Sequence, residues 1–380
     1  MNQLQERIST VQDAISFKKT ARIPTHSQYW TYMLLDAGYT LKEAIYDYDK
    51  LFAAVTSFHE KYQFDFYNYI GNRNPFAVTD AVKGNKYYFD PTGEFLNHAD
   101  YNVMREDEYP ELIADPKNFI WSKAVQRKCV GLADEDGADR FVKSVEEYEK
   151  YNACMNRISA YFYQELKVPK FALFTIPFDM MFDYLRGLKG MSIDLRRRFH
   201  QVKEAHDVLV EFMGVQKAID AILEPAEEGY LFGMSQVYLA HSILNVKQWE
   251  QIYWPFTKQM IDNCAASGKK FQLFSEADIL RFSDYFQDAP KGVVMLQPET
   301  DDVFELRKRL PNCAICGGMK PEYLGKKSKD ECLDYAKKLV EEIGVDGGFI
   351  MGQTKMMSYR NDAKPENILA VQQFCRTCRS

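Results

Sequence analysis

The 380-residue chain is 46% hydrophobic and carries a formal net charge of −6 at pH 7, with a pI near 5.7. An acidic chain lacks the excess of lysine and arginine that a nucleic-acid or anionic-membrane surface requires, so we exclude both as main partners and expect a small molecule or another protein. No apolar run approaches the roughly 20 residues that span a bilayer, and no signal-peptide core is seen, so a cytoplasmic protein with reduced cysteines is expected.

The N-terminal part of the chain predicts an irregular region. Residues 1–20 have the amphipathic pattern of a helix, and the apolar spacing over 30–62 is again helical. Residues 61–70 alternate between apolar and polar side chains, as a strand does. We therefore predict a helical extension over residues 1–60, followed after the strand by an elaborated insertion over 71–122, where Asn, Gly and Pro are frequent.

A regular alternation of helices and strands begins near residue 138. Helical patterns cover 139–166 and 194–222, and shorter ones follow the later strands. Continuous apolar runs predict strands at 171–178, 229–240, 270–276, 292–298, 313–318 and 347–352. This order indicates βα units in a parallel sheet whose strands are covered on both faces.

The number of these units favours a closed barrel over an open sheet. With the strand near residue 65 included, the units approach the eight of a (β/α)8 barrel. No glycine-rich phosphate-binding loop supports a nucleotide fold. We therefore predict an α/β fold in which residues 1–380 form a single (β/α)8 TIM-type barrel domain with an elaborated N-terminal helical region.

Chemistry in such a barrel occurs at the carboxyl ends of the strands, where several polar residues are expected. Glu276 ends one apolar run and is interpreted as a general acid or metal ligand, with helix capping as the alternative. His241 follows another strand and is either functional or an ordinary hydrogen-bonded histidine. Glu299 also follows a strand. Asp65 is predicted to point toward the barrel mouth as a third catalytic side chain, with a strand-end salt bridge as the alternative.

A metal site is predicted from the same strand ends. Cys316 together with His241 and Glu276 would form a three-ligand zinc site with one open position, which is the arrangement that catalytic zinc prefers. Cys313 is not expected to join Cys316, because strand alternation turns the two side chains to opposite faces.

Five stretches of the chain resemble the uroporphyrinogen decarboxylase superfamily, in its corrinoid-dependent methyltransferase branch of anaerobic bacteria. The resemblance covers most of the chain, is strongest from about residue 138, and implies a (β/α) barrel. The superfamily includes both decarboxylases and corrinoid-dependent methyltransferases. The stretches are IPFDMMFDYLRGLKGMSIDLRRRF, LAHSILNVKQWEQIYWPF, KFQLFSEADILRFSDYFQDAPKG, AICGGMKPEYLGKKSKDECLDYAKKLVEE and GGFIMGQTKMMSYRNDAKPENILAV.

Departures from the superfamily's patterns favour one activity. Similar decarboxylases carry an RQAGR loop, whose arginines hold substrate carboxylates, where this chain reads ARIPTHSQYW. Similar thiol methyltransferases have a His-x-Cys pair at the position of 274–276 and a further Cys after the last strand, where this chain reads GQTK. Two of three zinc-thiolate ligands are therefore substituted, and an acid, Glu276, stands in their place.

The resemblance then implies methyl transfer from a small methylated donor to the Co(I) corrinoid of a small corrinoid-binding protein. A methoxylated aromatic is the preferred class of donor. An excess of aromatic residues, 24 Tyr and 26 Phe, would suit an aryl-ether cleft, although a Phe-rich core explains it equally. Gly317, Gly318 and Gly348 are expected to allow close approach of a flat corrin ring, with ordinary turns as the alternative.

Several alternatives stay open at this point. Transfer could run from a methylcorrinoid to a thiol or folate, or the chain could be a tetrapyrrole decarboxylase or a non-catalytic corrinoid- or tetrapyrrole-binding protein. Zinc is an expected cofactor only if the three ligands meet. No nucleic acid or membrane is expected as partner, and a homodimer is left open.

Overall fold

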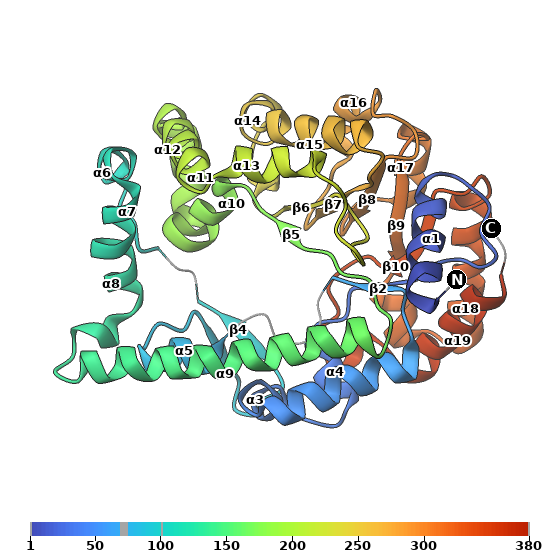
Figure 1. The fold of residues 1–380 in the computed structure, drawn as a ribbon, viewed down its shortest axis with the longest axis horizontal. Coiled ribbons are helices and arrows are strands. Elements are labelled where there is room, and N and C mark those ends of the chain that lie inside the picture. The colour runs from blue at the N-terminus through green and yellow to red at the C-terminus, as the bar shows by residue number, and fades with distance from the viewer. Residues whose placement is uncertain (1, 69–74, 100–101, 379–380) are drawn as a thin grey trace.

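The computed structural model describes residues 2–68, 75–99 and 102–378. Parallel strands form its centre (Figure 1). The strands of this centre are β1 (His26–Ser27), β2 (Phe66–Tyr67), β5 (Leu173–Phe174), β6 (Met234–Tyr238), β7 (Phe271–Ser275), β8 (Val294–Pro298), β9 (Ala314–Met319) and β10 (Phe349–Gln353). Within the described ranges, β5 to β10 make a six-stranded parallel sheet, and β1 and β2 make a parallel pair.

These strands follow one another around an α/β barrel of the TIM type, as predicted. Single bridges from Thr25 to Met351 and from Tyr29 to Met357 join the β1 side to the β10 side. The strand order is therefore β2-β1-β10-β9-β8-β7-β6-β5. Between β2 and β5, aromatic rings make the contact, with the centroids of Phe66 and Phe171 at 6.2 Å.

The strands near the N-terminus differ from their prediction. β1 lies inside the segment predicted as a helical extension, so residues 1–60 contribute a barrel strand. The strand predicted over 61–70 begins only at Phe66, because α4 (Tyr48–Tyr62) continues to Tyr62 and ends at Gln63 in the left-handed conformation (φ 55°). Two-residue strands such as β1 are too short to show an alternation pattern.

Helix α1 (Gln3–Ile15) packs across the amino end of the barrel. Its apolar residues Ile8, Val11, Ala14 and Ile15 belong to one buried cluster with residues of the barrel interior. Polar contacts attach the same helix to the amino ends of several strands: Gln12 donates to the Leu231 carbonyl at 3.0 Å, and Gly348 N donates to the Ala14 carbonyl at 2.9 Å. The amino end is therefore sealed, which leaves the carboxyl end for chemistry.

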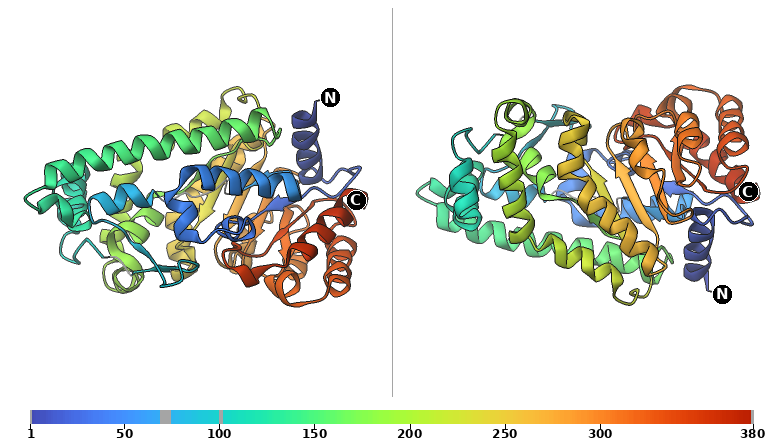
Figure 2. Two further views of the ribbon diagram at one scale, coloured as in Figure 1. Left: turned by 90° about the horizontal axis from the view of Figure 1, so that it is seen from below. Right: turned by 90° about the horizontal axis from the view of Figure 1, so that it is seen from above.

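The remaining helices of the barrel surround the strands (Figure 2). Between β1 and β2 the short α2 and α3 precede the longer α4, and from β5 onward at least one helix follows each strand, as the alternation predicts. The bounds are α2 (Tyr32–Asp36), α3 (Leu41–Tyr46), α10 (Pro177–Met180), α11 (Gly187–Arg197), α12 (Phe199–Phe212), α13 (Val215–Asp220), α14 (Val246–Ile252), α15 (Trp254–Ala266), α16 (Ser283–Phe286), α17 (Val303–Arg309), α18 (Lys329–Ile343) and α19 (Pro365–Thr377).

The predicted insertion forms a separate arm of the molecule (Figure 1). Its described part contains α5 (Phe76–Ala81), the antiparallel hairpin β3 (Tyr87–Phe89) and β4 (Leu96–His98), and then α6 (Tyr109–Ala114) and α7 (Pro116–Phe119). Beyond its predicted end at residue 122 follow α8 (Val125–Lys128) and the long α9 (Gly137–Gln164). A buried ion pair anchors it: Arg186 Nε lies 2.6 Å from Asp194 Oδ2, which also accepts from the Tyr109 hydroxyl at 2.8 Å.

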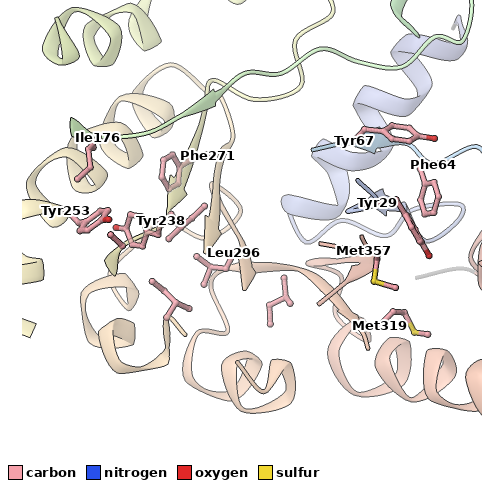
Figure 3. Packing of buried hydrophobic residues seen from close by; sticks show 14 of the residues in the cluster. Tyr29, Phe64, Tyr67, Ile176, Tyr238, Tyr253, Phe271, Leu296, Met319 and Met357 are labelled. Carbon is pink, nitrogen blue, oxygen red and sulfur yellow. The ribbon is translucent and has the colours of Figure 1, made fainter. Parts of the chain in front are cut away.

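The aromatic excess is largely a property of the core. All of the largest fully buried side chains are aromatic. Figure 3 shows two such groups, Tyr238 with Tyr253 on one side of the strands and Tyr29 with Phe64 on the other. The ring centroids are 4.6 Å apart in the first pair and 5.6 Å in the second. Packing between strands and helices therefore accounts for much of the Tyr and Phe content.

Candidate active site at the barrel mouth

Two carboxyl-bearing residues lie side by side at the carboxyl ends of β7 and β8. Ser275 pairs with Pro298 at the last registered position of these strands, so Glu276 and Glu299 are the next facing pair. The ladder continues through both, because Glu299 N donates to the Ser275 carbonyl and Glu276 N to the Tyr238 carbonyl, each at 3.0 Å. The sequence predicted this strand-end position for both glutamates.

Strand alternation sends Glu276 toward the barrel interior. Ser275 lies on the helix side, where its Oγ is 3.0 Å from His241 Nε2, so its neighbour faces the opposite way. Glu299 follows the same rule: Met295 belongs to the interior cluster and Gln297 bonds across the interior to Gln272. Both glutamates therefore face the mouth.

His241 lies on the other side of the sheet and does not join them. Its ring is fully buried between Tyr238, Tyr253 and Phe282, with centroid distances of 5.3, 6.4 and 6.3 Å. Nε2 donates to the Asp278 carbonyl at 3.0 Å. Burial lowers the pKa of His241 to about 4, so the ring is neutral near pH 7. The predicted catalytic and ligand role of His241 is corrected to one of fixing the loop that follows β7.

Cys316 faces the interior one layer below the two glutamates, because the register of β8 and β9 sets it level with Gln297. It belongs to the apolar cluster formed with α1 and Ile350, and burial raises the pKa of its thiol well above the usual value. Across residues 2–68, 75–99 and 102–378, no three His, Cys, Asp or Glu side chains are grouped so that they could hold a metal ion. The predicted zinc set of His241, Glu276 and Cys316 is therefore not assembled, because its members lie on different faces and at different depths.

Asp65 was placed at the wrong end of the barrel. It precedes β2, where both carboxylate oxygens accept from the Arg22 guanidinium at 2.7 Å and Oδ2 also accepts from Thr25 N at 2.8 Å. Its side chain is almost fully buried. The correction follows from the late start of β2: the strand-end salt bridge, which was the alternative, is what the structure contains.

The three predicted cofactor-binding glycines have different surroundings. Gly348 (φ +68°) lies at the amino end of β10, where an added Cβ would stand 2.3 Å from the Phe17 ring, so its role at the mouth is corrected to packing. Gly318 (φ +98°) allows the Leu339 side chain to approach, at 2.8 Å from such a Cβ. Gly317 (φ +137°) has only the Gln353 carbonyl oxygen within 4 Å, at 3.7 Å, and leaves space around it.

Below the two glutamates, the barrel interior contains a network of neutral polar side chains. Such interiors are usually filled by branched apolar residues. Here Gln272 donates to Gln297 Oε1 at 2.6 Å, and Asn68 donates to Gln28 Oε1 at 3.0 Å. Gln28 in turn donates to Glu299 Oε1 at 3.2 Å. These residues come from β7, β8 and the carboxyl ends of β1 and β2, so the network crosses the barrel.

This network was not predicted, although part of its signal lies in the sequence. Gln272 and Gln297 each interrupt an otherwise apolar run, at positions that alternate with outward-facing apolar residues. A polar side chain at an inward position of a fully buried strand needs a partner inside the barrel. Gln28 and Asn68 gave no comparable signal because their strands are two residues long.

Fold and site together define a TIM-type barrel with its acidic groups at the carboxyl edge. Residues 164–378, more than half of the chain, match the family described as "Uroporphyrinogen decarboxylase (URO-D)", and the chain belongs to that family. Among solved structures it is similar to a methyltransferase from Methanosarcina mazei, with 11% sequence identity, a TM-score of 0.60 and 96% of each chain covered. That likeness concerns the fold. None of the curated proteins matches the chain.

The helices of the described part of the chain include none that could span a membrane. Each is too short or too polar to cross a bilayer. This agrees with the sequence, in which no apolar run of that length was found.

Proposed function

We propose that this protein is a corrinoid-dependent methyltransferase. It takes a methyl group from a small methylated donor, with methoxylated aromatics as the first class, and passes it to the Co(I) corrinoid of a small partner protein. The observation that carries the proposal is the facing pair Glu276 and Glu299 at the barrel mouth. Membership of the family, and a fold shared with a methyltransferase, support it.

Two adjacent carboxyl groups suit the cleavage of a methyl ether. An alkoxide or phenoxide is a poor leaving group, so the ether oxygen needs a proton as its bond to carbon breaks. Carboxyl groups that share a site tend to hold one proton between them, because two negative charges repel each other. In the proposed reaction the C–O electron pair stays on oxygen, that oxygen gains the proton, and the methyl group passes to the partner's cobalt, which supplies the electron pair for the new bond.

The donor groups of the site support this acid role better than the alternatives. The described residues offer no three-ligand metal group, so no step of the proposal runs through zinc. Thiol activation would need a thiolate near the mouth, whereas the Cys316 thiol is deep in the apolar cluster. Decarboxylation of a tetrapyrrole would need arginines at the mouth, and Arg22 is instead paired with Asp65 at the amino end.

The proposal is tested by mixing the purified protein with a Co(I) corrinoid protein and a panel of methoxyarenes. Formation of methyl-Co(III), followed by visible absorbance, is the expected result, with loss of the signal when the methoxyarene or the protein is omitted. Demethylation of a methylcorrinoid only in the presence of a thiol or folate would favour transfer in the opposite direction. Tight corrinoid binding without turnover in either direction would favour a non-catalytic carrier.

A further inference from the structure

The interior network is directional, and Glu299 is its end point. The Ser235 hydroxyl donates to Gln272 Oε1 at 2.5 Å. Gln272 donates to Gln297, Gln297 donates to Gln28 Oε1, and Gln28 donates to Glu299 Oε1 at 3.2 Å. The series passes from β6 through β7 to β8, crosses the interior to Gln28 after β1, and returns to Glu299 at the end of β8. Because each amide uses its oxygen as acceptor for the preceding group, its NH2 is committed to the next.

The series therefore fixes which oxygen of Glu299 is available. Oε1 accepts from Gln28 Nε2 and also from Met356 N at 3.0 Å. Within the described residues Oε2 accepts no hydrogen bond, and this oxygen keeps some exposure to solvent. A carboxyl group with both donors on one oxygen carries its proton on the other. Oε2 of Glu299 is thus the oxygen left to carry a proton.

The surroundings of Glu299 favour its protonated form. Across the described residues, Glu299 forms no salt bridge. The charge of Lys355 acts on Glu299, but the Nζ atom of Lys355 lies 3.5 Å from Asp362 Oδ1. Burial raises the pKa of Glu299, and the hydrogen bonds from Met356 and Gln28 and the charge of Lys355 oppose this.

We propose that Glu299, held by Gln28, is the proton donor of the reaction, with Oε2–H aimed at the departing oxygen of the methyl donor. This inference rests on the proposed function and assigns its acid. In the step, the Oε2–H bond breaks as an O–H bond forms on the leaving oxygen, and the methyl C–O electron pair stays on that oxygen. The products are a neutral alcohol or phenol, a methylated corrinoid and an ionised Glu299, which regains its proton from solvent. Gln28 is a positioning residue.

The leaving-group dependence of the rate tests this assignment. Methoxyarenes with ring substituents of increasing electron withdrawal release phenols of decreasing pKa, which depend less on a proton donor. Glu299→Gln should lower the rate with unsubstituted methoxybenzenes by about 10²- to 10⁴-fold. The loss should shrink steadily as the phenol becomes more acidic, so the variant should show a steeper dependence on phenol pKa than the wild type. An equal loss for all donors would overturn the assignment.

Two comparisons separate the acid from a structural effect. Glu305→Gln, at an exposed position on α17, should leave both the rate and its leaving-group dependence unchanged. Gln28→Met removes a donor to Oε1 and should shift the pH–rate profile to higher pH, because a carboxylate loses a stabilising hydrogen bond. A Gln28→Met variant that lost rate without any shift of the profile would contradict the positioning role.

A second measurement does not depend on methyl transfer. Asp179 is also protonated near pH 6, so the band is read from infrared difference spectra of the full-length proteins. Wild type minus Glu299→Gln should contain a protonated-carboxyl C=O band, and wild type minus Glu305→Gln should contain none. If the wild type transfers no methyl group but shows this band, the proposed function fails while the protonated state of Glu299 stands. If methyl transfer is observed and the band is missing, Glu299 is ionised and is not the proton donor.

Discussion

Glu276 and Glu299 occupy facing positions on neighbouring strands, one residue beyond the registered pair Ser275 and Pro298. Neither position alone would define a site, because a single glutamate at a strand end often caps a helix. Their joint placement above a network of neutral amides puts two carboxyl groups on rigid supports at the open end of the barrel. The following predictions derive from this arrangement and from the corrected positions of the other candidates.

Glu276→Gln should lower methyl transfer from methoxyarenes by about 10²-fold or more, since one of the two carboxyl groups is lost. The position at a strand end, only partly buried, predicts little change in the melting temperature. Visible absorbance of the corrinoid measures the rate, and circular dichroism checks the fold. A rate within twofold of the wild type would remove Glu276 from the site.

Cys316→Ala should leave methyl transfer within about twofold of the wild type and cost about 1 kcal/mol of stability, because the thiol packs in an apolar cluster. Activity assays and urea unfolding measure the two effects. Loss of activity together with loss of bound zinc would show instead that the thiol binds a metal.

Asp65→Asn should destabilise the protein by about 2 kcal/mol. This is less than the loss expected for a fully buried ion pair, because the Arg22 side chain is 21% exposed. Activity per folded molecule should not change, since Asp65 lies at the amino end. Asp13→Asn, which removes an exposed ion pair with Lys18, is the matched control and should cost under about 1 kcal/mol. Lost turnover in a fully folded Asp65→Asn protein would argue against this placement.

The stability of the protein should depend on the ionisation of Asp179. Burial raises the pKa of this carboxyl to about 7, against bonds from the Tyr253 hydroxyl and Ala240 N. In the unfolded chain Asp179 ionises near the ordinary pKa of an aspartate. Between that pKa and the raised pKa of the folded state, the folded protein binds more protons than the unfolded chain. The free energy of unfolding therefore falls as pH rises through this range, by at most about 1.4 kcal/mol per pH unit.

Asp179→Asn removes this ionisation. The difference in unfolding free energy between variant and wild type should therefore shift in favour of the variant from pH 5 to pH 8, whatever the offset at pH 5. Urea unfolding at four pH values measures it. Parallel curves for the two proteins would mean that Asp179 is already ionised in the fold.

Much of the barrel could be predicted because its later strands are continuous apolar runs separated by periodic helices. Glu276 was found for the same reason: it ends such a run. β1 was missed because two residues carry no period, and with it Gln28 was missed as part of the site. The error at Asp65 has the same origin, since the alternation over 61–70 did not show where α4 ends.

His241 and Cys316 illustrate a different limit. His241 follows its strand as predicted, whereas β9 continues past Cys316 to Met319, so Cys316 lies within the strand. The face and depth of each side chain depend on register and on the turn after the strand. His241 points to the helix side beside Ser275, and Cys316 lies within the layer packed on α1. Convergence of three side chains cannot be inferred from strand order alone, because one residue of register reverses a side chain.

The most direct test of the central claim follows the methyl group itself. A methoxybenzene labelled with ¹³C in its methyl group is incubated with the protein and a Co(I) corrinoid protein, and the label is located by NMR. We expect the label to appear on the corrinoid and the unlabelled phenol to form in equal amount, with both products greatly reduced for Glu276→Gln. A label that remains on the arene under conditions where the wild type is folded would contradict the claim.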